Sequence, residues 1–274
     1  MESEVTSDMK RREFVTSSLV ASAMAGLGPT GAAANPGSDP APEYYQLMVW
    51  RLRRGPQVKL TDDFLRDAAL PAMGRLGVGP VGVFNTMIGP DSPTVYVLVP
   101  SPSLEAVATV TRRLFADAEF VKAGAAYINA PSTEPGYVRL ETSLLSAFTG
   151  MPKLEVPPAT AEKQTRIFEL RIYESHSKKA NLTKIKMFNE GEIAIFRRTG
   201  LRPVFFGETL IGRRLPNLTY MLTFDNIEQR EKNWSTFVSD PEWKKLSTTP
   251  GYTDVETVSN ITNVLLTPAP YSQI

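Results

Sequence analysis

The sequence predicts an α+β fold in which one strand–helix–strand–strand–helix–strand (βαββαβ) unit occurs twice and the two copies close a pseudo-symmetric barrel. Two observations carry this prediction. Residues 45–50 (YQLMVW) and 168–173 (FELRIY) both show the alternation typical of a strand, and they are spaced 123 residues apart. Residues 117–120 (DAEF) and 240–243 (DPEW) repeat at the same spacing. A spacing kept in separate segments indicates an internal repeat.

The second copy shows its first elements clearly. A strand over residues 167–174 precedes a helix from about residue 182 to 199 with apolar side chains roughly on one face. Gly200 is suited to the position that ends such a helix. Two strands, near residues 204–211 and 218–224, are separated by a turn with Gly, Pro and Asn, so they predict a hairpin.

The rest of the second copy completes the unit. A helix over residues 227–237 is followed by a helical turn in which Asp240 is the expected N-cap and Pro241 the first helical residue. An extended stretch over residues 254–266 closes the copy. This order is ferredoxin-like. Because helices on one face of a sheet leave the other face bare, we expect the two copies to pair face to face.

The chain divides into five segments. We expect a signal segment over residues 1–34, a Pro-rich spacer over residues 35–43 and a first, degenerate repeat over residues 44–149. A Pro-containing linker over residues 150–164 leads into the second repeat, residues 165–274. The order of elements is expected to be the same in both repeats.

The first segment has the features of an export signal. Arg11 and Arg12 precede an uncharged apolar run over residues 14–27, and small residues ending at Ala34 suit signal peptidase, so the segment resembles a twin-arginine signal. It predicts a periplasmic or secreted bacterial protein, cleaved after Ala34; a disordered basic tail is the alternative. The run is shorter than the ~20 residues needed to span a bilayer, so no stable membrane anchor is expected after cleavage.

Composition excludes several classes of function. The 274 residues carry a formal net charge of +1, which disfavours nucleic acid as a partner. There are no cysteines, so disulfides, thiolate metal sites and iron–sulfur clusters are excluded. His176 is the single histidine, which excludes metal sites built from several imidazoles, so no metal is expected. The sequence does not identify a cofactor. A haem with one axial histidine is still compatible with the composition.

A family resemblance rests on three segments of the second copy. Residues 168–173 (FELRIY), 188–192 (FNEGE) and 240–243 (DPEW) resemble a NIPSNAP domain. The first copy keeps only the skeleton, with Met48 in place of the strand arginine and Ala118 in place of the proline. The resemblance implies a dimeric α/β-barrel fold, here as a pseudo-dimer within one chain. That superfamily includes cofactor-free monooxygenases, haem-degrading enzymes and pure binding proteins, so fold alone does not choose among them.

The strand over residues 167–174 offers the first candidate site residue. Its polar row is Glu169, Arg171 and Tyr173, and by the period of two its apolar row points the other way. If the apolar row meets the helices, the polar row lines the barrel, and Arg171 could hold a carboxylate or enolate ligand. The alternative is an internal ion pair with Glu169 or Glu208, because buried charges are usually paired.

A tyrosine and a carboxylate on the predicted hairpin form a second candidate. Glu208 lies in the second strand of the second copy and Tyr220 in the third, opposite Tyr96 of the first copy after a one-residue slip. Such a pair in a pocket could act as acid and base. A structural hydrogen bond is the alternative.

The remaining candidates lie on the helix and at the strand end. Gly191 inside a helix indicates close backbone approach or a local bulge, and Glu190 beside it is a candidate acid or base facing the pocket. The alternative is a solvated helix face. His176, just past the first strand of the copy, could be a general base or haem ligand, or a solvent-exposed loop residue.

The leading hypothesis is an exported protein that binds a small organic ligand, with the pocket mainly in the second copy. An oxygenase- or isomerase-like reaction on an apolar substrate would be its enzymatic form. The alternative is a non-catalytic interaction or structural protein with solidly packed barrels. A cavity of a few hundred Å³ would favour the ligand. Association with a second copy of the chain, giving a homo-oligomer, is also open.

Overall fold

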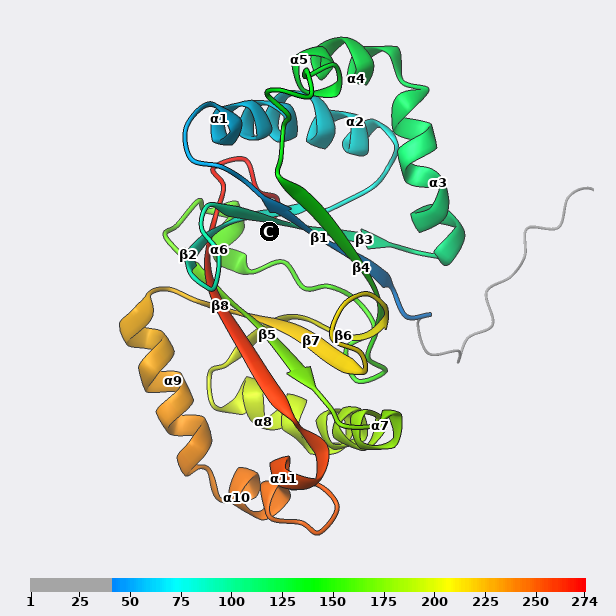
Figure 1. Cartoon of the computed structure of the whole chain (residues 1–274). Helices are drawn as coiled ribbons and strands as arrows, with labels where there is room; N and C mark the ends of the chain where they lie inside the picture. Colours follow the sequence, from blue (N-terminus) through cyan, green and yellow to red (C-terminus); the bar gives the residue numbers. More distant parts are fainter. Residues whose placement is uncertain (1–40) are drawn as a thin grey trace, which may run out of the picture. The chain divides into compact units, whose positions relative to one another are not determined.

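The computed structural model describes residues 41–274, so the predicted signal segment and its cleavage site lie outside the described residues. Within the described residues, antiparallel strands form a closed barrel in the order β1-β3-β2-β8-β5-β7-β6-β4 (Figure 1). The strands are β1 (Tyr44–Arg51), β2 (Gly82–Ile88), β3 (Thr94–Ser101), β4 (Arg139–Ala147), β5 (Ile167–Glu174), β6 (Arg202–Ile211), β7 (Asn217–Phe224) and β8 (Asn260–Pro268). The α+β class and the barrel predicted from the sequence are confirmed.

Helical segments connect the strands in the predicted order within each half. The first half has α1 (Pro56–Asp63), the π-helical segment η1 (Phe64–Ala69), α2 (Leu70–Arg75), α3 (Leu104–Phe115), α4 (Ala118–Ala123) and α5 (Ala125–Ile128). A short helix, α6 (Pro158–Ala161), lies in the connecting segment. The second half has α7 (Lys178–Met187), the π-helical segment η2 (Phe188–Glu192), α8 (Ile193–Arg198), α9 (Ile227–Ser239), α10 (Pro241–Ser247) and α11 (Asp254–Thr257).

Each half contributes four neighbouring strands, and the halves join at two seams. The first half supplies β4, β1, β3 and β2, and the second supplies β8, β5, β7 and β6. The seams are the β2–β8 and β4–β6 pairings, each with a register shift. Helices lie outside the two groups of strands (Figure 1), so each strand has one face toward the barrel interior and one toward helices.

The inward face of β5 is the apolar one. Phe168 and Leu170 belong to the core cluster of the barrel interior. Glu169, Arg171 and Tyr173 therefore point toward the helices of the second half, so the condition under which this polar row would line the barrel is not met. The physical reason is that the closed interior offers few polar partners, whereas helix α9 brings polar side chains against the outer face of the strand.

Several local predictions for the second half are confirmed. Gly200 ends the helix with φ 85°, in the left-handed region that favours glycine. Asp240 caps α10 by accepting hydrogen bonds from two backbone N–H groups, and Pro241 follows it. Gly191 lies in the π-helical segment η2, where a Cβ would stand 2.9 Å from a methyl carbon of Leu246. Both the bulge and the close approach expected at this glycine are therefore present.

One stretch differs from its predicted conformation. Residues 254–266 were expected to be extended throughout, but they begin with the short helix α11. Thr253 and Glu256 form a capping box, in which each side chain bonds the backbone N–H of the other's residue. This local bonding stabilises one helical turn before β8 starts.

Candidate functional site

A large cavity lies in the first half, between the outer face of its strands and its helices. Its volume is about 580 Å³, within the range usual for small-molecule sites. Strand β1 contributes Gln46, Met48 and Trp50, and the helical side includes Phe64 and Leu114. The sequence predicts a pocket mainly in the second copy, whereas this cavity lies in the first half and outside the barrel interior.

The cavity opens to solvent through an apolar rim. Phe115, Tyr137 and Leu140 line it, and their exposed fractions are 55%, 39% and 39%. Exposed large apolar side chains gathered at the mouth of a cavity are typical of ligand sites. The rim therefore offers an apolar molecule a continuous path from the surface to the interior.

The polar groups of the cavity are few and uncharged. No Asp, Glu, Lys, Arg or His is among the residues that line it in the part of the chain that the structure describes. Trp50 Nε1 donates a hydrogen bond to the hydroxyl oxygen of Tyr127 at 2.9 Å, and Phe64 stacks on the Tyr127 ring at 4.0 Å. Because its oxygen accepts from Trp50, the Tyr127 hydroxyl keeps its own proton to donate. Burial raises the pKa of Tyr127, so the proton stays in place near neutral pH.

The corresponding layer of the second half is filled. Strand register places Met48 opposite Val97 in the first half and Arg171 opposite Tyr220 in the second. Val97, and not Tyr96, therefore stands where Tyr220 stands; Tyr96 points into the barrel interior. Aromatic rings pack the layer around Tyr220, among them Phe148, Tyr173, Phe188, Phe196, Phe206 and Phe237.

Arg171 belongs to a buried ion-pair network in this filled layer. The Glu169 carboxylate accepts one hydrogen bond from Arg171 at 2.8 Å, two from Arg230 and one from Trp234. Burial alone would raise the pKa of Glu169, but the hydrogen bonds from Arg230 and the charge of Arg171 outweigh it and lower the pKa. The alternative of an internal ion pair with Glu169 is therefore what the structure shows for Arg171.

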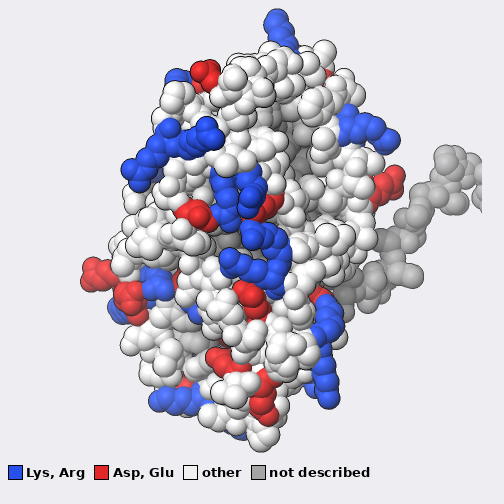
Figure 2. Space-filling model, viewed as in Figure 1, with Lys and Arg blue, Asp and Glu red and all other residues white. Residues whose placement is uncertain are grey.

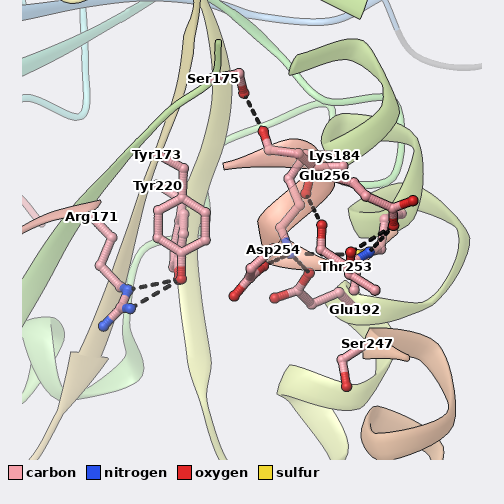
Figure 3. Close-up of polar contacts among 12 residues, drawn as sticks. Arg171, Tyr173, Ser175, Lys184, Glu192, Tyr220, Ser247, Thr253, Asp254 and Glu256 are labelled. Carbon is pink, nitrogen blue, oxygen red and sulfur yellow. Dashed lines mark hydrogen bonds and ion pairs between the residues drawn. The ribbon is translucent and has the colours of Figure 1, made fainter. Parts of the chain in front are cut away.

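Two tyrosines extend this network. Arg171 Nη2 donates to the Tyr173 hydroxyl at 3.0 Å, and the hydroxyls of Tyr173 and Tyr220 are 3.0 Å apart (Figure 3). Burial raises the pKa of both tyrosines, so both are protonated near neutral pH. Of the predicted site residues, Arg171 and Tyr220 are thus brought together, through Tyr173.

A second buried charge pair lies beside these tyrosines. Lys184 is 1% exposed and Glu192 is 2% exposed, and their Nζ and Oε2 atoms are 3.5 Å apart. Lys184 also lies 3.1 Å from an oxygen of the more exposed Asp254 (Figure 3). Burial raises the pKa of Glu192 to about 7 although the charge of Lys184 opposes the shift. This carboxyl therefore titrates near neutral pH.

The other predicted residues lie elsewhere. Glu208 pairs with Lys178 and does not contact Tyr220. Glu190 is exposed and bonds Tyr252, as a solvated helix face would predict. His176 is exposed. The structure therefore does not gather the five residues into one pocket, and their catalytic roles stay predictions.

Sequence reasoning missed Lys184, Glu192 and Tyr127. The buried pair is spread over a helix that contains a π-helical turn, which shifts the usual helical spacing. Tyr127 lies on the four-residue helix α5, too short to show a periodicity. At the repeat spacing Val97 aligns with Tyr220. That alignment would have shown the position at which the first half has the smaller side chain.

The described residues lack two further classes of site. No group of three or more His, Cys, Asp or Glu side chains in residues 41–274 is placed to hold a metal ion. The helices of the same region include none with the length and apolar character that a membrane crossing needs.

Comparisons with known proteins agree with this architecture. The NIPSNAP family model matches residues 168–273. A provisionally assigned monooxygenase from Lactobacillus acidophilus is 8% identical over 83% of this chain and 94% of its own, with a TM-score of 0.55. Another, from Fusobacterium nucleatum, is 10% identical over 83% and 93%, with a TM-score of 0.51. At these identities the likeness shows the fold alone.

A shorter structure resembles part of the chain. An uncharacterised NIPSNAP-like domain protein from Burkholderia xenovorans is 23% identical over 39% of this chain and 87% of its own, with a TM-score of 0.35. Comparison with curated proteins found no match. The family match is thus confined to residues 168–273, and the two longer structures share the fold of the chain.

Proposed function

We propose that the protein binds a neutral, largely apolar organic molecule in the cavity of its first half. The observation that carries the proposal is the cavity of about 580 Å³ with its apolar, solvent-reaching rim. Apolar side chains left open to water at such a cavity cost stability, and a bound apolar molecule would cover them. The filled layer of the second half shows that the same arrangement of elements can be packed without such a cavity.

The lining favours a ligand without formal charge. A charged group moved into this cavity would lose its hydration and meet no opposite charge among the described lining residues. One acceptor, such as a carbonyl or hydroxyl oxygen, could accept a hydrogen bond from the Tyr127 hydroxyl. The ring pair of Phe64 and Tyr127 offers a flat surface for an aromatic ligand.

Binding is a better-supported role for this cavity than acid–base catalysis. An oxygenase or isomerase that works without a cofactor needs a group to remove a proton from its substrate. The described lining offers only hydroxyl and amide side chains for that task, and burial raises the pKa of Tyr127. The monooxygenase assignments of the two structurally similar proteins are therefore no basis for assigning that activity to this chain.

A neutral fluorescent probe tests the proposal. The full chain titrated with N-phenyl-1-naphthylamine should show saturable fluorescence enhancement at one probe per chain. Val97→Tyr introduces into the cavity the side chain that Tyr220 has at the equivalent position of the second half. This substitution should abolish the enhancement. Val121→Tyr is the matched control, since Val121 is exposed and does not line the cavity.

The results separate the two hypotheses for this protein. Binding that Val97→Tyr removes and Val121→Tyr keeps supports the ligand site. Probe binding equal in all three proteins, or absent from the unmodified chain, would contradict it and favour the alternative of an interaction protein.

We also propose that this binding takes place outside the cytoplasm. The proposal rests on Arg11, Arg12 and the apolar run that follows them. Replacing both arginines by lysine should trap a tagged full-length chain in the cytoplasm of a bacterial host. Unchanged fractionation of the variant would exclude the twin-arginine route.

A further inference from the structure

A second, smaller pocket opens at one end of the barrel. The turns of residues 89–93 and 212–216, which join β2 to β3 and β6 to β7, both lie at this end. The pocket measures about 80 Å³, and it shares no lining residue with the cavity of the first half. Its floor includes Leu47, Leu170 and Val264 of the buried barrel interior. Figure 2 shows basic side chains gathered over the middle of one face, with acidic side chains beside them.

Three arginines stand among the lining residues of this pocket. Arg213 donates from Nη1 to Glu141 at 2.6 Å, and Arg214 donates from Nη1 to the hydroxyl of Thr262 at 2.7 Å. Their Nε and Nη2 groups donate no hydrogen bond to any residue in the described part of the chain. Each guanidinium therefore keeps donors for a further acceptor.

Three carboxylates around the pocket equal the three arginines in number, but they do not use every guanidinium donor. Glu141 is the one carboxylate among the described lining residues. Arg51 pairs with Asp91 and lies 3.5 Å from Glu141, so it is already engaged. Glu174 lies 3.9 Å from Arg214, at the outer limit of an ion pair. Arg213 and Arg214 are thus the groups best placed to receive an additional anion.

A buried asparagine fixes the backbone that carries these two arginines. Asn217 is 1% exposed, and its Nδ2 donates to the carbonyl oxygens of Arg213 at 2.9 Å and Arg214 at 3.1 Å. Its Oδ1 accepts hydrogen bonds from the hydroxyls of Thr209 and Thr219. The turn is therefore preorganised by a fully bonded side chain, as binding loops often are.

The turn also holds Arg214 in an uncommon backbone conformation. Its φ is 60°, in the left-handed region where residues other than glycine are infrequent. At the repeat spacing, the other turn carries Asp91 in this place, and its φ is not positive. This backbone conformation is therefore found in one hairpin and not in its counterpart. Such strained residues are typically found at functional sites, and Arg214 lines a pocket.

We propose that this pocket binds a short-chain carboxylate, with its oxygens on Arg213 and Arg214 and its apolar end on the barrel floor. Two arginine forks suit the planar geometry of a carboxylate. One water needs roughly 10–15 Å³ of such volume, so the pocket holds a ligand of about six non-hydrogen atoms. Butyrate has that size and joins an anionic end to an apolar one.

The test compares three anions on the full chain at constant ionic strength and neutral pH, by titration calorimetry. Butyrate should bind up to about fifteenfold more tightly than acetate, because two more methylene groups reach the apolar floor. Inorganic phosphate, which has no apolar end, should bind more weakly than butyrate although it carries the larger charge. Equal affinity for all three anions would overturn the proposal, because it would indicate nonspecific attraction to surface arginines.

Single substitutions locate the site. Arg213→Gln and Arg214→Gln should each weaken butyrate binding about tenfold, since each removes charge-assisted hydrogen bonds. Arg202→Gln is the control, because Arg202 pairs with Asp225 and does not line the pocket. Circular dichroism establishes that each variant is folded; if Arg214→Gln is not, Arg213→Gln decides. Butyrate affinity unchanged in a folded Arg213→Gln would also overturn the proposal.

Discussion

The two halves of the barrel share an order of elements and differ in what lies between sheet and helices. In the first half, Met48 and Val97 are partners on the neighbouring strands β1 and β3. Both border a cavity of about 580 Å³. In the second, Arg171 and Tyr220 hold the same places within a packed aromatic layer. The backbone arrangement therefore tolerates both an open and a filled layer. Function has to be inferred from that layer and not from the fold.

The difference extends to charge. The described residues lining the cavity carry no charged side chain, whereas the second half buries Glu169, Lys184 and Glu192 and half-buries Arg171. Buried ion pairs cost desolvation and contribute little net stability, but losing one partner is expensive. The second half is therefore expected to be the more sensitive to substitution, and the first half the more tolerant.

The largest effect is expected at Lys184. Replacing it by methionine keeps most of the side-chain volume but leaves the Glu192 carboxyl buried without its cation. Breaking a buried pair in this way costs about 3–5 kcal/mol. Urea unfolding of the single variant measures the loss. The double variant Lys184→Met/Glu192→Leu should recover most of it; a double variant no more stable than the single one would show that Lys184 acts through other contacts.

An exchange of side chains between the halves should have the next largest effect. Tyr220→Val opens a void in a packed aromatic core and should cost about 2–4 kcal/mol. Val97→Tyr fills existing space and should cost less than about 1 kcal/mol. Thermal and urea unfolding of both variants test the asymmetry. Equal losses would mean that the first half is as tightly packed as the second.

The pH dependence of stability sharpens the comparison further. The folded protein holds the Glu192 proton up to a pKa of about 7, above the ordinary value of 4.5 for an unfolded chain. The free energy of unfolding should therefore fall as pH rises from about 4.5 to 7, by up to about 3 kcal/mol. Burial sets most of this fall, and the charges of Lys184, Asp254 and Arg171 adjust its size.

Glu192→Gln isolates this contribution. Its stability, measured by urea unfolding at several pH values, should lack the fall seen for the unmodified chain, because glutamine does not titrate. Parallel curves for the two proteins would show that Glu192 has an ordinary pKa.

Local sequence signals predicted much of the fold. The strand β5, the cap at Asp240 and the helix end at Gly200 each depend on a few neighbouring residues, so they could be predicted from those residues alone. The direction of the β5 faces could not. A period of two separates Phe168 from Arg171, but it does not say which row turns inward when helices cover the outer face.

The candidate site was harder to predict for a different reason. A cavity is made by what is missing, and Val97 and Met48 are ordinary strand residues in isolation. Aligning Tyr96 with Tyr220 concealed the loss of volume, because a shift of one residue exchanges the two faces of a strand. The buried Lys184 and Glu192 also gave no signal, since charged residues on a helix usually face solvent.

The smallest effect is expected at the polar anchor of the cavity. Tyr127→Phe keeps the ring that stacks on Phe64 but removes the hydroxyl that accepts from Trp50 and can donate to a ligand. A neutral ligand with an acceptor, such as 2-naphthaldehyde, should bind about five- to tenfold more weakly to the variant, since one hydrogen bond contributes about 1 kcal/mol. Naphthalene, which has no acceptor, should bind equally to both proteins. Trp50 lines the cavity, so quenching of its fluorescence reports both ligands. Because only the acceptor-bearing ligand is expected to respond, the pair of titrations separates a directed hydrogen bond from a general loosening of the cavity.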